Sequence, residues 1–291
     1  MISIVPENYI ERDFDKYIYY INSIPLQVKS DKHRIASNVT AIKQRFSDFD
    51  ANQNKLENIM PSPFTKLSNI DLYNDLYELF DNKKTLKDNI RKIYSKKCPY
   101  CGTLNTPKHV DHFIPRSDFP EYAVFVKNLV PSCSICNSDY KGNLFLKNGE
   151  RQFFNPYFDN FINDIVFLKC EIILNDDIYP RFIFSIDDSL KSLHPYEHTI
   201  IKNHFDNLDL ETRYEEQISD HIFARFKEEY IIDETLEFED VTLEELKLDI
   251  DSKIRSLRRE NDNYWEKVFW KALKNSDGCL NLIVNKLIPI N

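Results

Sequence analysis

The sequence predicts an α+β fold in which an irregular middle segment lies between mainly helical flanks. In the first and last thirds of the chain, apolar residues recur every three or four positions, as on one face of a helix. Two runs rich in β-branched and aromatic residues, 165–174 and 181–186, are typical of strands. Prolines are spread through residues 98–158, which indicates short elements joined by turns.

Residues 1–82 are predicted to form a helical N-terminal region. Apolar residues at 17–24 indicate a first helix. A second helix is predicted by four residues at a helical spacing: Ile35, Val39, Ile42 and Phe46. A third is expected over 71–80, where Leu72 and Leu76 share one face. A basic helix is then expected over 83–97, which contains seven basic residues and one acidic residue.

Residues 159–291 are predicted to form a C-terminal region of short strands followed by helices, after a core at 83–158. Thr242 and Glu245 have the spacing of a capping box, and the apolar repeat after them indicates an amphipathic helix. Segment 228–251 has eleven acidic residues and one lysine. We interpret it as a solvated helix face, with a docking or autoinhibitory surface as the alternative.

Charge is unevenly distributed along the chain. The 291 residues carry a net charge of −9, but residues 83–151 carry 13 Lys and Arg against 6 Asp and Glu, a net of +7. A local basic region is the expected footprint of a phosphate-backbone site, even in an acidic protein. The chain contains no apolar run long enough for a membrane span and no basic leader before an apolar run. We therefore expect a cytoplasmic protein without a membrane partner.

Four of the six cysteines form two C-x2-C pairs, which are Cys98 with Cys101 and Cys133 with Cys136. In a reducing compartment such pairs favour metal binding over disulfides. Four thiolates suit one structural Zn²⁺ in tetrahedral coordination. The other two, Cys170 and Cys279, lie in apolar runs and are predicted to be buried.

A polar cluster lies between and just after these pairs: Asp111, His112, Asn128 and Asn137. Hydrolysis of a phosphodiester needs an activated water and a cation near the phosphate. A histidine can accept the proton of that water near neutral pH, so His112 is the candidate general base. Asp111 and the amide of Asn137 offer the oxygen ligands that Mg²⁺ or Mn²⁺ prefers.

The ordered pattern over roughly residues 95–158 resembles the HNH (ββα-metal) endonuclease family, in its zinc-braced form with two C-x2-C knuckles. The resemblance implies that Asn128 is the middle residue of the motif, which holds the loop carrying His112. It also implies that Asn137 stands where many members have the last histidine. Arg116 and Lys141 are predicted to contact phosphate.

The resemblance implies metal-dependent hydrolysis of nucleic acid, with DNA and RNA both open as substrates. It further implies a setting in phage defence or in a mobile element, in some members beside an ATPase partner. The alternative is a non-catalytic, zinc-folded module that binds nucleic acid or protein. Cleavage of nucleic acid in the presence and absence of a chelator separates the two.

Overall fold

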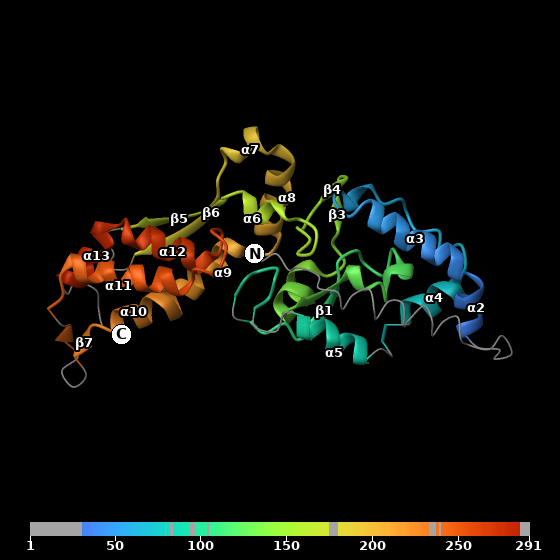
Figure 1. The fold of residues 1–291 in the computed structure, drawn as a ribbon, viewed down its shortest axis with the longest axis horizontal. Coiled ribbons are helices and arrows are strands. Elements are labelled where there is room, and N and C mark those ends of the chain that lie inside the picture. The colour runs from blue at the N-terminus through green and yellow to red at the C-terminus, as the bar shows by residue number, and fades with distance from the viewer. Residues whose placement is uncertain are drawn as a thin grey trace. The chain divides into compact units, whose positions relative to one another are not determined.

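The computed structural model describes residues 31–78, 80–81, 84–93, 97–103, 105–174, 180–232, 237–238 and 240–285. They form two compact units, residues 2–160 and 161–291 (Figure 1). Both units combine helices with two-stranded antiparallel sheets, so the α+β prediction is confirmed. The helix expected around 17–24 lies outside the described residues.

The first unit begins with helices that pack beside its core. They are α2 (Asp31–Ser37), α3 (Val39–Ala51), η1 (Leu56–Asn58), α4 (Ile70–Glu78) and α5 (Lys84–Ile93). The helix predicted from Ile35 to Phe46 is interrupted at Asn38, whose side chain donates to the carbonyl of Arg34 at 2.9 Å. Such a local bond competes with the helical ladder, so α2 and α3 are separate helices.

The middle of the chain forms a strand–strand–helix arrangement. Strand β1 (His109–His112) pairs antiparallel with β2 (Leu129–Ser132), and His112 lies opposite Leu129. Between the strands come the short turns η2 (Pro120–Tyr122) and η3 (Val126–Asn128), and after β2 comes the π-helical segment η4 (Ile135–Lys141). Helix α5 packs on both strands through Ile90, which shares a buried apolar cluster with Leu129.

A tight hairpin closes this unit. Strands β3 (Leu146–Lys147) and β4 (Glu150–Arg151) are joined by Asn148 and Gly149, which both have positive φ. Asn-Gly is the favoured pair for a two-residue hairpin because both positions need the left-handed region.

The second unit is built on the hairpin of β5 (Leu168–Ile173) and β6 (Arg181–Ile186), close to the two strand runs that the sequence predicted. The remaining elements are α6 (Phe161–Asp164), α7 (Leu190–Leu193), α8 (Pro195–Asn207), α9 (Leu210–Gln217), η5 (Ile218–Phe223), α10 (Ala224–Glu228), β7 (Ile231–Ile232), β8 (Glu237–Phe238), α11 (Leu243–Ser256), α12 (Trp265–Lys274) and α13 (Asp277–Val284). Helix α9 packs on β6 and α12 on β5 (Figure 1). The stacked rings of Tyr214 and Trp265 join these two helices over the sheet.

Two details of the second unit were predicted from sequence, with different outcomes. The capping box is confirmed, because the Thr242 hydroxyl accepts from the Glu245 N–H and the Glu245 carboxylate accepts from the Thr242 N–H. Cys279 is buried, but Cys170 is only half-buried. The prediction for Cys170 was wrong because its two-stranded sheet is too small to cover every apolar position. Among the described residues, no helix is both long and apolar enough to span a bilayer.

Candidate active site and metal centre

The four cysteines of the two C-x2-C pairs meet in one buried cluster. Their sulfur atoms all lie within 4.8 Å of one another, although the pairs are more than thirty residues apart in sequence. A tetrahedral zinc with bonds of about 2.3 Å requires sulfur–sulfur distances of about 3.8 Å, which this cluster reaches with small shifts. The backbone N–H of Cys133 donates to the sulfur of Cys98 at 3.3 Å. The donor set and its geometry therefore fit a structural zinc.

Two of these thiols stay protonated in the absence of a cation. Burial raises the pKa of Cys98 well above its usual range, and the neighbouring Cys101 raises it further. Contact with Cys101 is the main reason that the pKa of Cys136 is also raised well above its usual range. Several thiolates cannot coexist in a buried cluster without a compensating positive charge. A zinc ion bound by the four cysteines would supply that charge.

Asp111 is buried on β1 and accepts hydrogen bonds at both carboxylate oxygens. Its Oδ2 accepts from the Tyr100 hydroxyl at 2.6 Å, and its Oδ1 accepts from the Lys141 ammonium at 3.1 Å. Burial raises the pKa of Tyr100 well above its usual range, and the nearby Asp111 raises it further, so this hydroxyl remains a donor. Oδ2 lies 3.1 Å from the Lys141 ammonium as well, whereas Oδ1 keeps a further lone pair. Asp111 can therefore still offer an oxygen to a cation.

His112 follows Asp111 and is held on two sides. Its Nε2 lies 2.9 Å from the carbonyl oxygen of Ala123, and its ring meets the ring of Phe80 nearly edge-on, with 4.6 Å between centroids. A carbonyl only accepts, so in the neutral ring Nε2 carries the proton and Nδ1 is the acceptor. Burial lowers the pKa of His112 to about 3, although the Ala123 carbonyl opposes this shift. The ring is therefore neutral near pH 7.

Asn128 joins the two ends of the connection between β1 and β2. Its Oδ1 accepts from the Ile114 N–H at 2.7 Å, and its Nδ2 donates to the carbonyls of Ile114 at 2.9 Å and of Tyr122 at 3.3 Å. The side chain is fully buried. Asn128 thus contacts Ile114, two residues after His112, and the η2 turn that precedes Ala123.

Asn137 and Arg116 lie in different environments. Asn137 is in η4, four residues before Lys141, so the two share one side of this helical segment. Lys141 contacts Asp111, which orients that side toward β1. Within the described residues the Asn137 side chain has no hydrogen-bond partner. Arg116 donates to the Tyr77 carbonyl and to Asp81, both at 2.9 Å.

The segment that carries the cysteine cluster and the polar residues matches a known protein family. The model of the family described as HNH endonuclease matches residues 98–142, from the first cysteine of the cluster to the end of η4. Residues 98–142 form an HNH endonuclease domain. Over a longer stretch, the chain is 28% identical to Protein ea31 of Escherichia phage lambda, in an alignment 233 positions long that covers 73% of each chain. No solved structure matches the chain.

Within the HNH domain, the geometry does not support the prediction that Lys141 contacts phosphate. Its side chain has no exposed area, and its ammonium also donates to the His112 carbonyl at 3.1 Å. The rings of Phe113 and Phe153 lie within 6 Å of the ammonium. Lys141 therefore acts as the buried counter-charge of Asp111 rather than as a surface cation.

Two groups that contact the HNH residues directly were not predicted from the sequence. Tyr100 lies inside the first knuckle, where its hydroxyl reaches Asp111. The carbonyl of Ala123 is a backbone group, so its contact with His112 cannot be predicted from the type of residue at position 123. The position of Tyr100 between two cysteines of the cluster could have indicated its role. A hydroxyl held next to a metal cluster can donate to a neighbouring polar site.

Proposed function

We propose that this chain is a metal-dependent endonuclease that hydrolyses phosphodiester bonds in nucleic acid. The observation that carries the proposal is the environment of His112 in the HNH domain. This histidine is neutral, its Nε2–H is donated to the Ala123 carbonyl, and it directly follows Asp111, whose side chain is buried. A neutral imidazole with a fixed tautomer presents one defined nitrogen, Nδ1, to a water molecule.

In this proposal each polar residue has a separate role. His112 Nδ1 accepts the proton of the attacking water. Asp111 and Asn137 offer oxygen ligands to a divalent cation such as Mg²⁺ or Mn²⁺. That cation, when bound, supplies positive charge for the phosphate and for the leaving oxygen. Asn128 holds the loop that follows His112, through its bonds to Ile114.

The basic helix α5 is the proposed contact for the phosphate backbone beside the site. Lys84 and Lys92 on this helix are exposed, while its apolar side packs on β1 and β2. Arg116 is the second proposed contact, because its guanidinium is partly exposed even though it is bonded to α4 and Asp81. Phosphate contacts of this kind position nucleic acid without reading its sequence.

The setting is also part of the proposal. The similar protein, Protein ea31, comes from phage lambda, which supports a phage-related context. We place the chain in the cytoplasm because the four clustered cysteines must stay reduced to bind zinc.

The proposal is tested by incubating the zinc-loaded protein with plasmid DNA and with total RNA, in the presence of Mg²⁺, Mn²⁺ or EDTA. Cleavage that EDTA abolishes is expected. Binding without cleavage in any metal would instead support the alternative of a non-catalytic, zinc-folded binding module.

A second experiment separates the cation ligands from the base. Asp111→Asn and Asn137→Ala are expected to reduce cleavage in a way that high Mn²⁺ partly restores, because they weaken cation binding. Asparagine keeps the size of Asp111 but has one acceptor oxygen, so it retains an acceptor for only one of Tyr100 and Lys141; its zinc content and circular dichroism are measured to show that the variant folds. No recovery at any metal concentration would argue against these ligands.

A further inference from the structure

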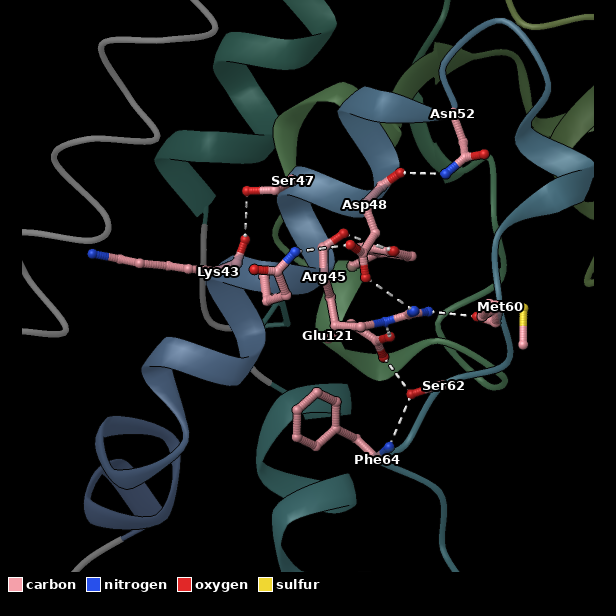
Figure 2. A network of polar contacts seen from close by, with 11 residues as sticks. Lys43, Arg45, Ser47, Asp48, Asn52, Met60, Ser62, Phe64 and Glu121 are labelled. Atoms are coloured by element: carbon pink, nitrogen blue, oxygen red, sulfur yellow. Dashed lines mark hydrogen bonds and ion pairs between the residues drawn. The ribbon is translucent and has the colours of Figure 1, made fainter.

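A buried ion pair joins helix α3 to the η2 turn. The Arg45 Nε donates to Glu121 Oε1 at 2.9 Å, and Ser62 donates to Glu121 Oε2 at 2.6 Å. The carboxylate of Glu121 has no exposed area, and the Arg45 side chain is 9% exposed. Figure 2 shows the Arg45 side chain leaving α3 toward Glu121, with its far end directed to the Met60 carbonyl at 2.6 Å.

The next residue of the turn is tied to the same arginine. The hydroxyl of Tyr122 donates to the backbone carbonyl of Arg45 at 2.9 Å, and the Arg45 guanidinium lies 5.7 Å from the centre of the Tyr122 ring. Two consecutive residues of η2 are therefore fixed to one residue of α3. Arg45 lies 76 residues before Glu121 in the chain, so this tie crosses from the N-terminal helices into the HNH domain.

The turn fixed in this way presents the carbonyl that holds His112. Ala123 directly follows Tyr122, and its N–H closes the turn by donating to the Pro120 carbonyl at 3.1 Å. The Ala123 carbonyl accepts from His112 Nε2 at 2.9 Å. A movement of η2 therefore changes the distance and angle of the hydrogen bond that selects the His112 tautomer.

A requirement for stability alone does not account for the chemistry of this contact. Burying an arginine and a glutamate has a high desolvation cost, and apolar side chains of similar volume fill such a space without it. Directional bonds differ from apolar packing because they fix orientation as well as proximity. Glu121 accepts from two segments distant in sequence, so its carboxylate has one defined place.

We propose that Arg45 and Glu121 are positioning residues for the nuclease site. By fixing η2 they hold the Ala123 carbonyl against His112 Nε2 and keep Nδ1 as the accepting nitrogen. The catalytic consequence rests on the proposed function, but the effect on the His112 ring does not.

The direct test is the tautomer of His112, read from ¹H–¹⁵N correlation spectra of the full, zinc-loaded chain with ¹⁵N-labelled histidine. The chain has seven histidines, and the signals of His112 are assigned by their loss in His112→Gln. In the parent protein we expect a single neutral tautomer with the proton on Nε2. In Glu121→Gln we expect a second tautomer, because the turn no longer has its charged anchor.

Glu121→Gln is a mild change, since Arg45 keeps Asp48 at 3.5 Å and the Met60 carbonyl as partners. Arg45→Lys should give a smaller effect in the same direction. Lysine keeps the positive charge, but it has a single ammonium in place of the separate nitrogens that bond Glu121 and the Met60 carbonyl. If Glu121→Gln loses its zinc or its helical circular dichroism, Ser62→Ala replaces it and removes one bond to Glu121. The matched control is Asp75→Asn, which breaks the Arg34–Asp75 pair between α2 and α4. This control should leave the His112 spectrum unchanged.

A single Nε2–H tautomer that persists in folded Glu121→Gln and Arg45→Lys overturns the proposal. Where Ser62→Ala replaces Glu121→Gln, a single Nε2–H tautomer in Ser62→Ala likewise overturns the proposal. Where the parent cleaves nucleic acid, Glu121→Gln should lower kcat by roughly tenfold to a hundredfold with KM unchanged, as a small misplacement of a catalytic group does. A parent without nuclease activity removes the proposed function but leaves the tautomer result to decide on the ion pair.

Discussion

The hydroxyl of Tyr100 donates to the carboxylate of Asp111 at 2.6 Å, which joins the first zinc knuckle to the strand that carries His112. Tyr100 lies between Cys98 and Cys101, so the position of its side chain depends on the metal cluster. A zinc ion bound by the cluster would therefore support the candidate active site through Tyr100 as well as through the general stability of the domain.

Loss of a zinc ligand is expected to disorder the HNH domain rather than only slow it. Structural zinc contributes roughly 10–16 kcal/mol of binding free energy coupled to folding. Cys133→Ser should lose its zinc, measured by elemental analysis, together with the near-ultraviolet circular dichroism of the domain. Cys170→Ser is the control, because this half-buried cysteine lies outside the cluster. Carefully purified parent protein that contains no zinc contradicts the assignment.

Alkylation should distinguish the zinc ligands from the buried thiol of Cys279. Burial raises the pKa of Cys279 to about 12. At pH 8, which is below that pKa, only roughly one molecule in ten thousand carries the reactive thiolate. Iodoacetamide should therefore leave Cys279 unmodified in the zinc-loaded protein, and chelation, which disorders the HNH domain, should expose the four ligand thiols to alkylation. Mass spectrometry provides the count, and rapid labelling of Cys279 before chelation would show that it is not buried.

The exposed lysines of α5 should contribute to the salt dependence of nucleic-acid binding. Replacing Lys84 and Lys92 by glutamine should flatten the log–log plot of affinity against salt by roughly 0.7–0.9 for each phosphate group that the variant no longer neutralises. The control replaces Lys43 and Lys191, which are exposed on α3 and α7, and removes the same charge. Equal slopes for the two double variants would show that α5 does not face the phosphate backbone.

Lys141 should be important for stability because it compensates the buried charge of Asp111. Lys141→Met leaves that carboxylate without its counter-charge, and breaking a buried pair in this way costs about 3–5 kcal/mol. Denaturant unfolding measures the loss. Lys127→Gln removes a pair with Asp50 in which both side chains are partly exposed, and it should cost less than about 1 kcal/mol. Similar values for the two variants would mean that Lys141 is not required in this role.

Local patterns in the sequence were enough to predict several of the helices. The helical spacing of Leu72 and Leu76 predicted α4, and Thr242 with Glu245 predicted the start of α11. These signals are readable because each depends on residues a few positions apart. The paired C-x2-C knuckles likewise predicted a metal cluster, since a known coordination geometry limits where the four ligands can lie.

The contacts that set the chemistry of the site were not readable in this way. Arg45 and Glu121 are polar residues with no pattern between them, and only the fold brings them together. Lys141 looked like a surface cation because lysine is rarely buried, yet the nearby carboxylate of Asp111 makes its burial possible. Partner choice among polar residues depends on tertiary structure, which periodicity does not encode.

The cleavage rate of His112→Ala is the most direct test of the central claim, which is that His112 acts as the general base of a nuclease. The rates of cleavage of plasmid DNA and total RNA by the parent and this variant are compared in Mg²⁺, with His221→Ala, an exposed histidine of η5, as the control. Positioned acid–base catalysis is worth about 10²–10⁴-fold, so His112→Ala should lose that much rate while keeping its zinc and its affinity for nucleic acid. A rate for His112→Ala close to that of the parent would contradict the role of His112 and the nuclease mechanism built on it.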